Sequence, residues 1–245
     1  MKYDKMAEEL KREYVLKFDF KKELLEKVKS LLNNSEWSSF SKTSFGGSGK
    51  ENFIGKLNKQ NEFIIDGPDN QYDMNDSNKL INDECVKKIV KDKHILKTLE
   101  AYFGEKPKLN KRKLNIFYTR NLDGNMEQIR KQGWHIDDPG KMERNEKYKF
   151  IKLFIPLCDV DETNGVTHII KGSHDKLPKG IKIGKKIQGK RWDDDFVYKH
   201  YDKKLLVTLK SKFGEVFLTR NDGFHKGGFC KEGSRIMIIA EYYVK

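Results

Sequence analysis

The sequence predicts a mainly β protein with added helices, and two observations support this prediction. Short apolar runs recur between turn residues in the second half of the chain, and no regular helical pattern separates most of them. These runs are LNIFYTR (114–120), GWHID (133–137), KFIKLFIPL (149–157), GVTHII (165–170), LLVTL (205–209), EVFLTR (215–220) and SRIMIIAEYYV (234–244). Such a series of strands is typical of a double-sheet jelly roll, a cupin-like double-stranded β-helix.

Helices are expected in the N-terminal part of the chain, residues 1–106. Asp19 is placed to cap a helix that ends near Leu32, because apolar residues follow it at helical spacing. A second helical region covers about residues 77–103 and stops before Gly104. We expect these N-terminal helices to pack on the outer face of one sheet.

The domain organisation follows from the absence of a Pro- or Ser-rich linker. A single domain over residues 1–245 is expected, with the jelly-roll core in residues 107–245. Residues 175–204 interrupt that core, and their Lys and Gly content and RWDDDF cluster suit a lid over a substrate. A solvated surface insertion explains the same features.

Charge and cysteine content limit the class of protein. The formal net charge is +13, but the Lys residues are spread along the whole chain and lack an aromatic-plus-basic recognition signature. A nucleic-acid partner is therefore disfavoured, although not excluded. The three Cys residues are odd in number and far apart, which fits a reducing cytoplasm. No apolar run is long enough for a membrane span, and the N-terminus has no apolar signal core.

One apparent motif is rejected. GGSGKE lies in residues 42–71, a Gly-, Asn- and Lys-rich stretch that predicts loops with short strands. A phosphate-binding loop needs Gly where Ser44 stands and Ser or Thr where Glu51 follows Lys50. The stretch therefore does not indicate nucleotide binding.

The segment GWHIDDPG contains a His-x-Asp pair, His135 and Asp137. Alternation along a strand places both side chains on one face, as a shared metal ion requires. A hydrogen-bonded polar pair at a strand end explains the pattern as well. Asp138 should face away from His135, so we interpret it as a turn residue before Pro139.

Two later residues bear on this choice. His225 lies in a Gly-rich turn after a predicted strand, and Arg235 begins the last strand ten residues later. Taken alone, His225 could be a solvated loop residue and Arg235 a surface cation. In a jelly roll, however, these strands bring distant polar residues to one barrel mouth.

The ordered set resembles the phytanoyl-CoA dioxygenase-like family of Fe(II)/2-oxoglutarate-dependent oxygenases. The matching pieces are His135 with Asp137, NGVTHIIKGSH (164–174), and His225 followed by Arg235, within about residues 114–243. The resemblance implies that His135, Asp137 and His225 hold Fe(II) and leave three positions open for 2-oxoglutarate and O2. It implies that Arg235 binds the far carboxylate of 2-oxoglutarate, as a planar bidentate cation can.

Several weaker assignments accompany the resemblance. Asn115 and Thr119 share a strand face and are candidates for cosubstrate contacts, although a polar sheet edge explains them equally. Gly227 stands where relatives commonly carry Ser or Thr, so one expected hydroxyl contact to the cosubstrate is missing. His168 and His174 are expected to serve structure and not to bind metal. Phe154 and Cys230 are expected to line the pocket or pack in the core.

The implied activity is hydroxylation of an aliphatic C–H bond of a small metabolite, with 2-oxoglutarate converted to succinate and CO2. A carboxylate at Asp137 disfavours halogenation, because halogenating relatives carry a small residue there. Arg120, Arg191 and Arg220 favour an anionic substrate slightly. The rival interpretations are a nucleic-acid-modifying oxygenase and a non-catalytic jelly-roll binding protein.

Overall fold

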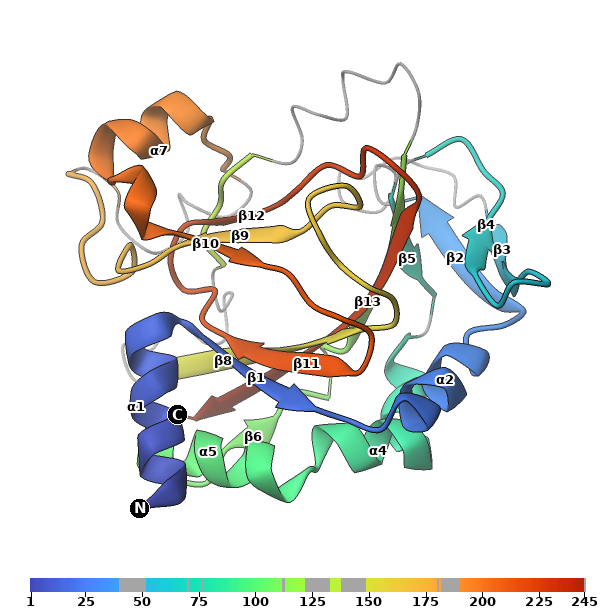
Figure 1. Ribbon diagram of the computed structural model, residues 1–245, viewed down its shortest axis with the longest axis horizontal. Coiled ribbons are helices and arrows are strands. Elements are labelled where there is room, and N and C mark those ends of the chain that lie inside the picture. Colours follow the sequence, from blue (N-terminus) through green and yellow to red (C-terminus); the bar gives the residue numbers. More distant parts are fainter. Residues whose placement is uncertain are drawn as a thin grey trace.

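The strands of the protein form two sheets that face each other (Figure 1). The computed structural model describes residues 1–39, 52–69, 71–75, 77–111, 113–121, 133–137, 149–179, 181 and 190–244. No helix within these ranges is long and apolar enough to span a membrane. The two facing sheets form the double-stranded β-helix that the sequence predicts.

The larger sheet has ten strands and is antiparallel throughout the pairs described. Its order is β1-β11-β8-β13-β7-β5-β2-β3-β4, and β6 pairs with β13. The strands are β1 (Val15–Asp19), β2 (Ser35–Ser39), β3 (Asn52–Leu57), β4 (Phe63–Ile65), β5 (Gln71–Met74), β6 (Lys108–Leu109), β7 (Asn115–Arg120), β8 (Lys149–Pro156), β11 (Glu215–Thr219) and β13 (Ser234–Val244). The N-terminal part therefore contributes strands as well as helices to the sheet.

The smaller sheet has the order β10-β9-β12, formed by β10 (Leu206–Leu209), β9 (Thr167–Ile170) and β12 (His225–Gly227). Two isolated bridges extend it beyond β12. His135 pairs with His225, and Trp134 pairs in turn with Trp192. Residues 133–136 thus lie between β12 and the segment that contains Trp192.

Helices α1 (Lys2–Glu13), α2 (Lys22–Ser30), α4 (Glu84–Val90) and α5 (Lys93–Phe103), with the 3-10 helix η1 (Ser77–Asn82), lie along the larger sheet on the side away from the smaller one (Figure 1). The expected N-terminal packing is confirmed. Helix α7 (Asp194–His200) and the 3-10 helix η2 (Lys203–Leu205) lie beside the smaller sheet.

The helix ends explain one wrong prediction. Asp19 does not cap a helix: it is the last residue of β1 and pairs with Glu215, and the helix begins at Lys22 without a side-chain cap. Asp83 and Asp92 do cap α4 and α5 through their carboxylates. Gly104 ends α5 in the left-handed region (φ 77°), which glycine adopts without strain.

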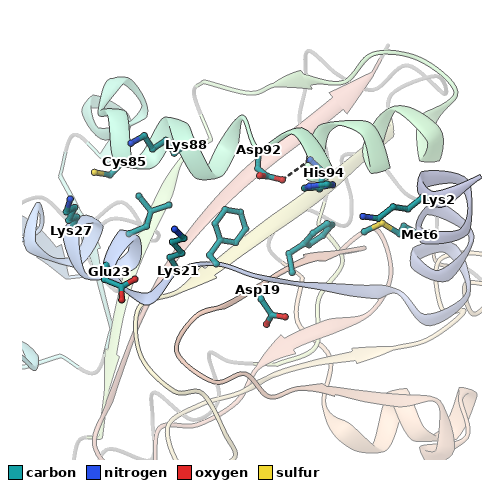
Figure 2. Close-up of a pocket in the computed structure, with 13 residues that line it drawn as sticks. Lys2, Met6, Asp19, Lys21, Glu23, Lys27, Cys85, Lys88, Asp92 and His94 are labelled. Atoms are coloured by element: carbon teal, nitrogen blue, oxygen red, sulfur yellow. Dashed lines mark hydrogen bonds between the residues drawn. The ribbon is translucent and has the colours of Figure 1, made fainter.

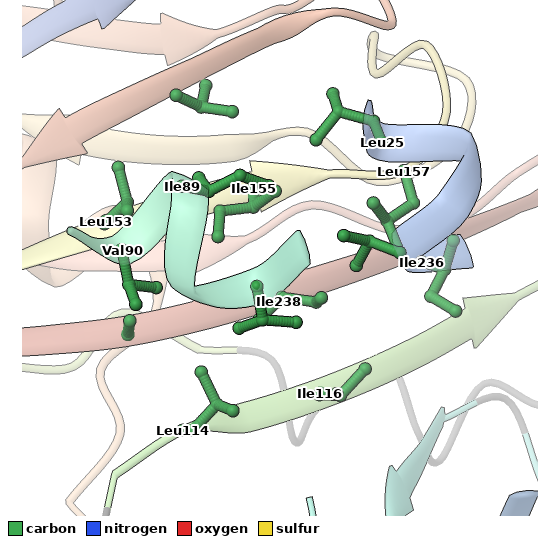
Figure 3. Close-up of a cluster of buried hydrophobic side chains, with 14 of the residues drawn as sticks. Leu25, Ile89, Val90, Leu114, Ile116, Leu153, Ile155, Leu157, Ile236 and Ile238 are labelled. Carbon is green, nitrogen blue, oxygen red and sulfur yellow. The ribbon is translucent and has the colours of Figure 1, made fainter. Parts of the chain in front are cut away.

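Alternation along β8 and β13 separates the core from the site. One set of side chains, which includes Ile155 and Ile238, points toward α2 and α4 and is fully buried there (Figure 3). The intervening residues Phe154, Met237 and Ile239 point to the space between the sheets, where they line a cavity. Each strand therefore packs against helices on one face and forms the site with the other.

Candidate metal centre

His135, Asp137 and His225 meet at one point between the sheets. Each offers one ligand atom, and these atoms all lie within 4.8 Å of one another. His135 and Asp137 share a face of the same extended segment, as their spacing predicts. His225 is placed beside them by mutual backbone hydrogen bonds with His135, both of 2.9 Å. The described residues contain no other cluster of this kind.

The two imidazoles are oriented by backbone carbonyls. Nδ1 of His135 lies 3.2 Å from the carbonyl oxygen of Gly133, and Nδ1 of His225 lies 3.0 Å from that of Gly223. A carbonyl can only accept, so each Nδ1 carries the proton and donates it. The Nε2 atom of each ring is then left with a lone pair. Such outer hydrogen bonds are typical of metal-ligating histidines.

The Asp137 carboxylate contacts the Lys152 ammonium and lies beside the His225 imidazole. Its Oδ2 lies 2.5 Å from Nζ of Lys152 and 3.2 Å from Nε2 of His225. Burial alone would raise the pKa of this carboxyl, but the Lys152 ammonium and the imidazoles outweigh burial and hold the pKa well below its usual range. Asp137 is therefore ionised at neutral pH.

The His135 imidazole is held in its neutral form. Burial lowers its pKa well below the usual range, and the neighbouring His225 adds to the effect. A neutral imidazole and an ionised carboxylate are the protonation states that bind a metal cation. The arrangement is therefore prepared for a cation before any ion arrives.

A cavity of about 210 Å³ adjoins the three ligands. Its polar lining includes Asn115, Lys152, Arg191, Asn221 and Arg235, and its apolar lining includes Phe117, Phe154, Met237 and Ile239. A larger cavity of about 570 Å³ lies among the helices and the β1–α2 connection, lined by Lys21, Lys27, Lys88 and His94 among others (Figure 2). It contains none of the predicted site residues.

Arg235, at the start of β13, lines the cavity of about 210 Å³ beside the metal ligands, where the sequence predicts it. Its Nη1 donates to the carbonyl of Gly165, while its buried Nε has no hydrogen-bond partner among the described residues. Thr119 lies opposite Arg235 on β7, and its buried Oγ1 also lacks a partner there. Asn115 lines the cavity, whereas Thr119 is not part of the lining.

The other predicted residues take the following places. His168 bonds to Thr208 through Nδ1, and His174 contacts the Tyr14 hydroxyl and Asp175, so neither belongs to the metal cluster. Phe154 and Gly227 line the cavity, and burial raises the pKa of the Cys230 thiol to about 11, which leaves it protonated. Asp138 and Pro139 lie outside the described residues, as do 180 and 182–189 of the predicted lid.

Two site residues were not found from the sequence. Lys152 is a cavity-lining cation that interrupts the apolar run of β8, and that interruption of KFIKLFIPL was a usable signal. Asn221 is buried, and its carbonyl accepts a hydrogen bond of 3.2 Å from the Asp137 backbone. Its side-chain oxygen has no partner in the described part of the chain. No sequence pattern marks this role.

The model of the family described as phytanoyl-CoA dioxygenase (PhyH) matches residues 53–230, more than half of the chain. The chain belongs to the PhyH family. The matched range contains His135, Asp137 and His225, and Arg235 lies just beyond it. No curated protein matches the sequence of this PhyH-family member.

Solved structures resemble this PhyH-family chain along nearly its full length. The epimerase SnoN, in complex with Fe3+, α-ketoglutarate and nogalamycin RO, is 13% identical with a TM-score of 0.60, covering 98% of this chain and 83% of that chain. The carbocyclase SnoK from nogalamycin biosynthesis is 11% identical with a TM-score of 0.61, covering 98% and 83%. EctD from S. alaskensis with bound Fe is 12% identical with a TM-score of 0.56, covering 97% and 75%. At these identities the likeness establishes the shared fold.

Proposed function

We propose that this protein is an Fe(II)- and 2-oxoglutarate-dependent oxygenase that hydroxylates an aliphatic C–H bond of a small molecule. The observation that carries the proposal is the meeting of His135, Asp137 and His225 at a cavity that Arg235 also enters. Two imidazoles and one carboxylate are the ligand set of non-haem iron oxygenases, and they leave positions open on the metal.

The residues of the site fit both Fe(II) and 2-oxoglutarate. The two Nε2 lone pairs and the ionised Asp137 carboxylate provide a donor set for a divalent cation. The unpaired buried Nε of Arg235 and Oγ1 of Thr119 are donors without a protein acceptor in the described chain. Buried donors of this kind usually have a partner, and a carboxylate of 2-oxoglutarate would supply one. The resemblance to the SnoN structure, which holds α-ketoglutarate, supports the same assignment.

When bound, the iron and 2-oxoglutarate would use O2 to oxidise a C–H bond, with release of succinate and CO2. The chain itself would hold and orient the reactants. His135, Asp137 and His225 would fix the metal, and Arg235 would anchor the cosubstrate. Thr119, opposite Arg235 on β7 but outside the cavity lining, stays a candidate for a further contact. Phe154, Met237 and Ile239 give the cavity an apolar wall that limits the access of water to the reacting centre. Asn115 remains a candidate for a further polar contact.

The reaction can be tested with isotopically heavy O2. The protein is incubated with Fe(II), 2-oxoglutarate and a fractionated extract of small metabolites, and products are followed by mass spectrometry. We expect one heavy oxygen atom in succinate and one in a new product. The matched control is His225→Ala, which lacks one ligand. Succinate formation at the same rate in this variant would overturn the proposal, as would wild-type succinate formation without a labelled product in any fraction.

A further inference from the structure

Three arginines were singled out as cations that favour an anionic substrate, and the structure assigns two of them to other partners. Arg120 donates to the backbone carbonyls of Ile65, Gly67 and Asp69. This places its guanidinium in a structural contact that joins β7 to the loop after β4. Its charge is therefore not directed at the cavity.

Arg220 also has a partner within the protein, Asp222. It makes two hydrogen bonds to Asp222, of 3.3 and 2.9 Å, and its guanidinium lies 4.9 Å from the centre of the Tyr14 ring. The ion pair raises the pKa of Arg220 although its burial acts in the opposite direction. Arg220 therefore stabilises the contact between β11 and the end of α1.

Arg191 differs because it lines the cavity beside the metal ligands. Trp134 and Trp192 exchange two backbone hydrogen bonds, of 2.8 and 2.9 Å, as an antiparallel pair. This bridge holds the segment of Arg191 beside the segment of His135. Both residues line the same cavity, so their side chains reach the same space.

Gly133 permits this close approach. A Cβ atom at Gly133 would lie 2.9 Å from the carbonyl oxygen of Trp192 and 3.1 Å from the Cβ of Arg191. Any larger residue would push the Arg191 segment away from the strand that carries His135. The glycine in GWHID therefore has a local role in holding Arg191 at the site.

The guanidinium of Arg191 has no acidic partner among the described residues. Its one hydrogen bond there goes from Nη1 to the carbonyl of its neighbour Lys190, at 3.3 Å. The residue is exposed, so a ligand in the cavity mouth can reach it from solvent. Partial burial lowers the pKa of Arg191, and the Asp137 carboxylate acts in the opposite direction. Asp137 attracts Arg191 at a distance, but no carboxylate of the described chain forms a salt bridge with it.

The charges around the cavity leave Arg191 uncompensated. Lys152 is paired with Asp137, and Arg235 is placed for one carboxylate of 2-oxoglutarate. The loaded site would carry five positive charges, from Lys152, Arg191, Arg235 and Fe(II), against three negative charges, from Asp137 and 2-oxoglutarate. The loaded site therefore keeps a positive charge at Arg191, and a guanidinium recognises carboxylate and phosphate groups by paired hydrogen bonds.

We propose that Arg191 forms an anion subsite at the cavity mouth and that the substrate carries a carboxylate or a phosphate group. This inference rests on the proposed oxygenase function, because it assigns the substrate class of that same site. The shared chemistry is a planar or tetrahedral oxyanion held by the guanidinium, in the same cavity as the metal ligands.

Binding can be measured without turnover. The wild-type protein, loaded anaerobically with Fe(II) and 2-oxoglutarate, is titrated in a calorimeter at low salt with inorganic phosphate, with hexanoate and with hexanamide. Loss of a charge-assisted hydrogen bond weakens binding by roughly tenfold or more. We therefore expect Arg191→Gln to bind the preferred anion at least about tenfold more weakly, with hexanamide unaffected. Tighter binding of phosphate or of hexanoate identifies which oxyanion the subsite prefers.

Lys190→Gln is the matched control, because it removes the same charge one residue away and Lys190 is not part of the cavity lining. This variant should bind both anions like the wild type. Equal anion affinity in wild type and Arg191→Gln, or no saturable anion binding by the loaded wild type, overturns the inference. The visible metal–cosubstrate band should be intact in Arg191→Gln. Its absence from the wild type would instead count against the proposed function.

Discussion

Nζ of Lys152 lies 2.5 Å from Oδ2 of Asp137, so the carboxylate of the candidate metal centre is already paired with a cation of the chain. Their side chains are 18% and 25% exposed, so water screens the pair only partly. The pair explains how this carboxylate can stay ionised although burial alone would raise its pKa. A bound metal cation would place further positive charge beside the Asp137 carboxylate.

This relationship predicts the stability of Lys152→Met. Removal of one partner of a largely buried pair leaves the other charge uncompensated, so the metal-free variant should lose about 3 kcal/mol of unfolding free energy. Added Mn(II) should raise the melting temperature of the variant more than that of the wild type, because the metal replaces the missing charge. Thermal denaturation with and without metal measures both effects. Equal stability of the metal-free proteins would contradict the pairing.

The pKa of His135 predicts how stability depends on pH. The folded chain holds this imidazole neutral well below its usual pKa, whereas the unfolded chain protonates it near pH 6.5. Below about pH 6.5 the unfolded state therefore binds more protons, and the metal-free protein should lose up to about 1.4 kcal/mol per pH unit from this group. Denaturant unfolding of wild type and His135→Asn between pH 7 and pH 5 measures the slope. An equally steep loss in both proteins would exclude His135 as its source.

Gly227 offers a gain-of-contact prediction. A Cβ atom at this position meets nothing within 4 Å, and Gly227 lines the cavity. Gly227→Ser should therefore fold normally and tighten 2-oxoglutarate binding several-fold, since one added hydrogen bond contributes about 1 kcal/mol. Calorimetric titration of the two iron-loaded proteins measures the change. Weaker binding by the variant would show that the position does not face the cosubstrate.

The neighbouring glycine provides a contrast. A Cβ atom at Gly228 would lie 2.5 Å from the carbonyl oxygen of Val166. Gly228→Ala should therefore lower the melting temperature, while Gly227→Ala leaves it unchanged.

Arg235→Lys tests the geometry of the anchor apart from its charge. A lysine ammonium cannot form the paired hydrogen bonds of a guanidinium, so the affinity for 2-oxoglutarate should fall by roughly tenfold or more although the charge is kept. Metal binding should be unchanged, because the three ligand residues are intact. Titrations of metal and of cosubstrate separate these effects. Full retention of cosubstrate affinity by Arg235→Lys would indicate that only charge matters.

The long strands of the C-terminal part could be predicted from the sequence, whereas several short strands of the N-terminal part could not. β8 and β13 carry long apolar runs, and their predicted bounds agree closely with the structure. β2 reads SEWSS and has a single apolar residue, and β5, QYDM, is only four residues long. β2 is held between β3 and β5, and β5 is held between β2 and β7. Asp19 was misassigned because a carboxylate before an apolar pattern resembles a cap even where a strand pairing occupies it.

The site residues also fall into two groups, those that the sequence could indicate and those that only the fold identifies. The spacing of His135 and Asp137 and the later His225 and Arg235 were visible in the sequence, because alternation and order along the chain fixed them. The pairing of Lys152 with Asp137 depends on which strands become neighbours across the barrel. Likewise, only the fold separates Arg191 at the cavity from Arg120 and Arg220, which bind other partners.

The central claim is that the three ligands and Arg235 together bind iron and 2-oxoglutarate. Anaerobic titration of the metal-free protein with Fe(II) and 2-oxoglutarate, followed in the visible spectrum, tests it most directly. We predict a weak charge-transfer band that saturates at one equivalent of iron, is lost in His135→Ala, and needs more 2-oxoglutarate in Arg235→Lys. A wild-type protein that gives no band, or a band that persists in His135→Ala, would contradict the claim.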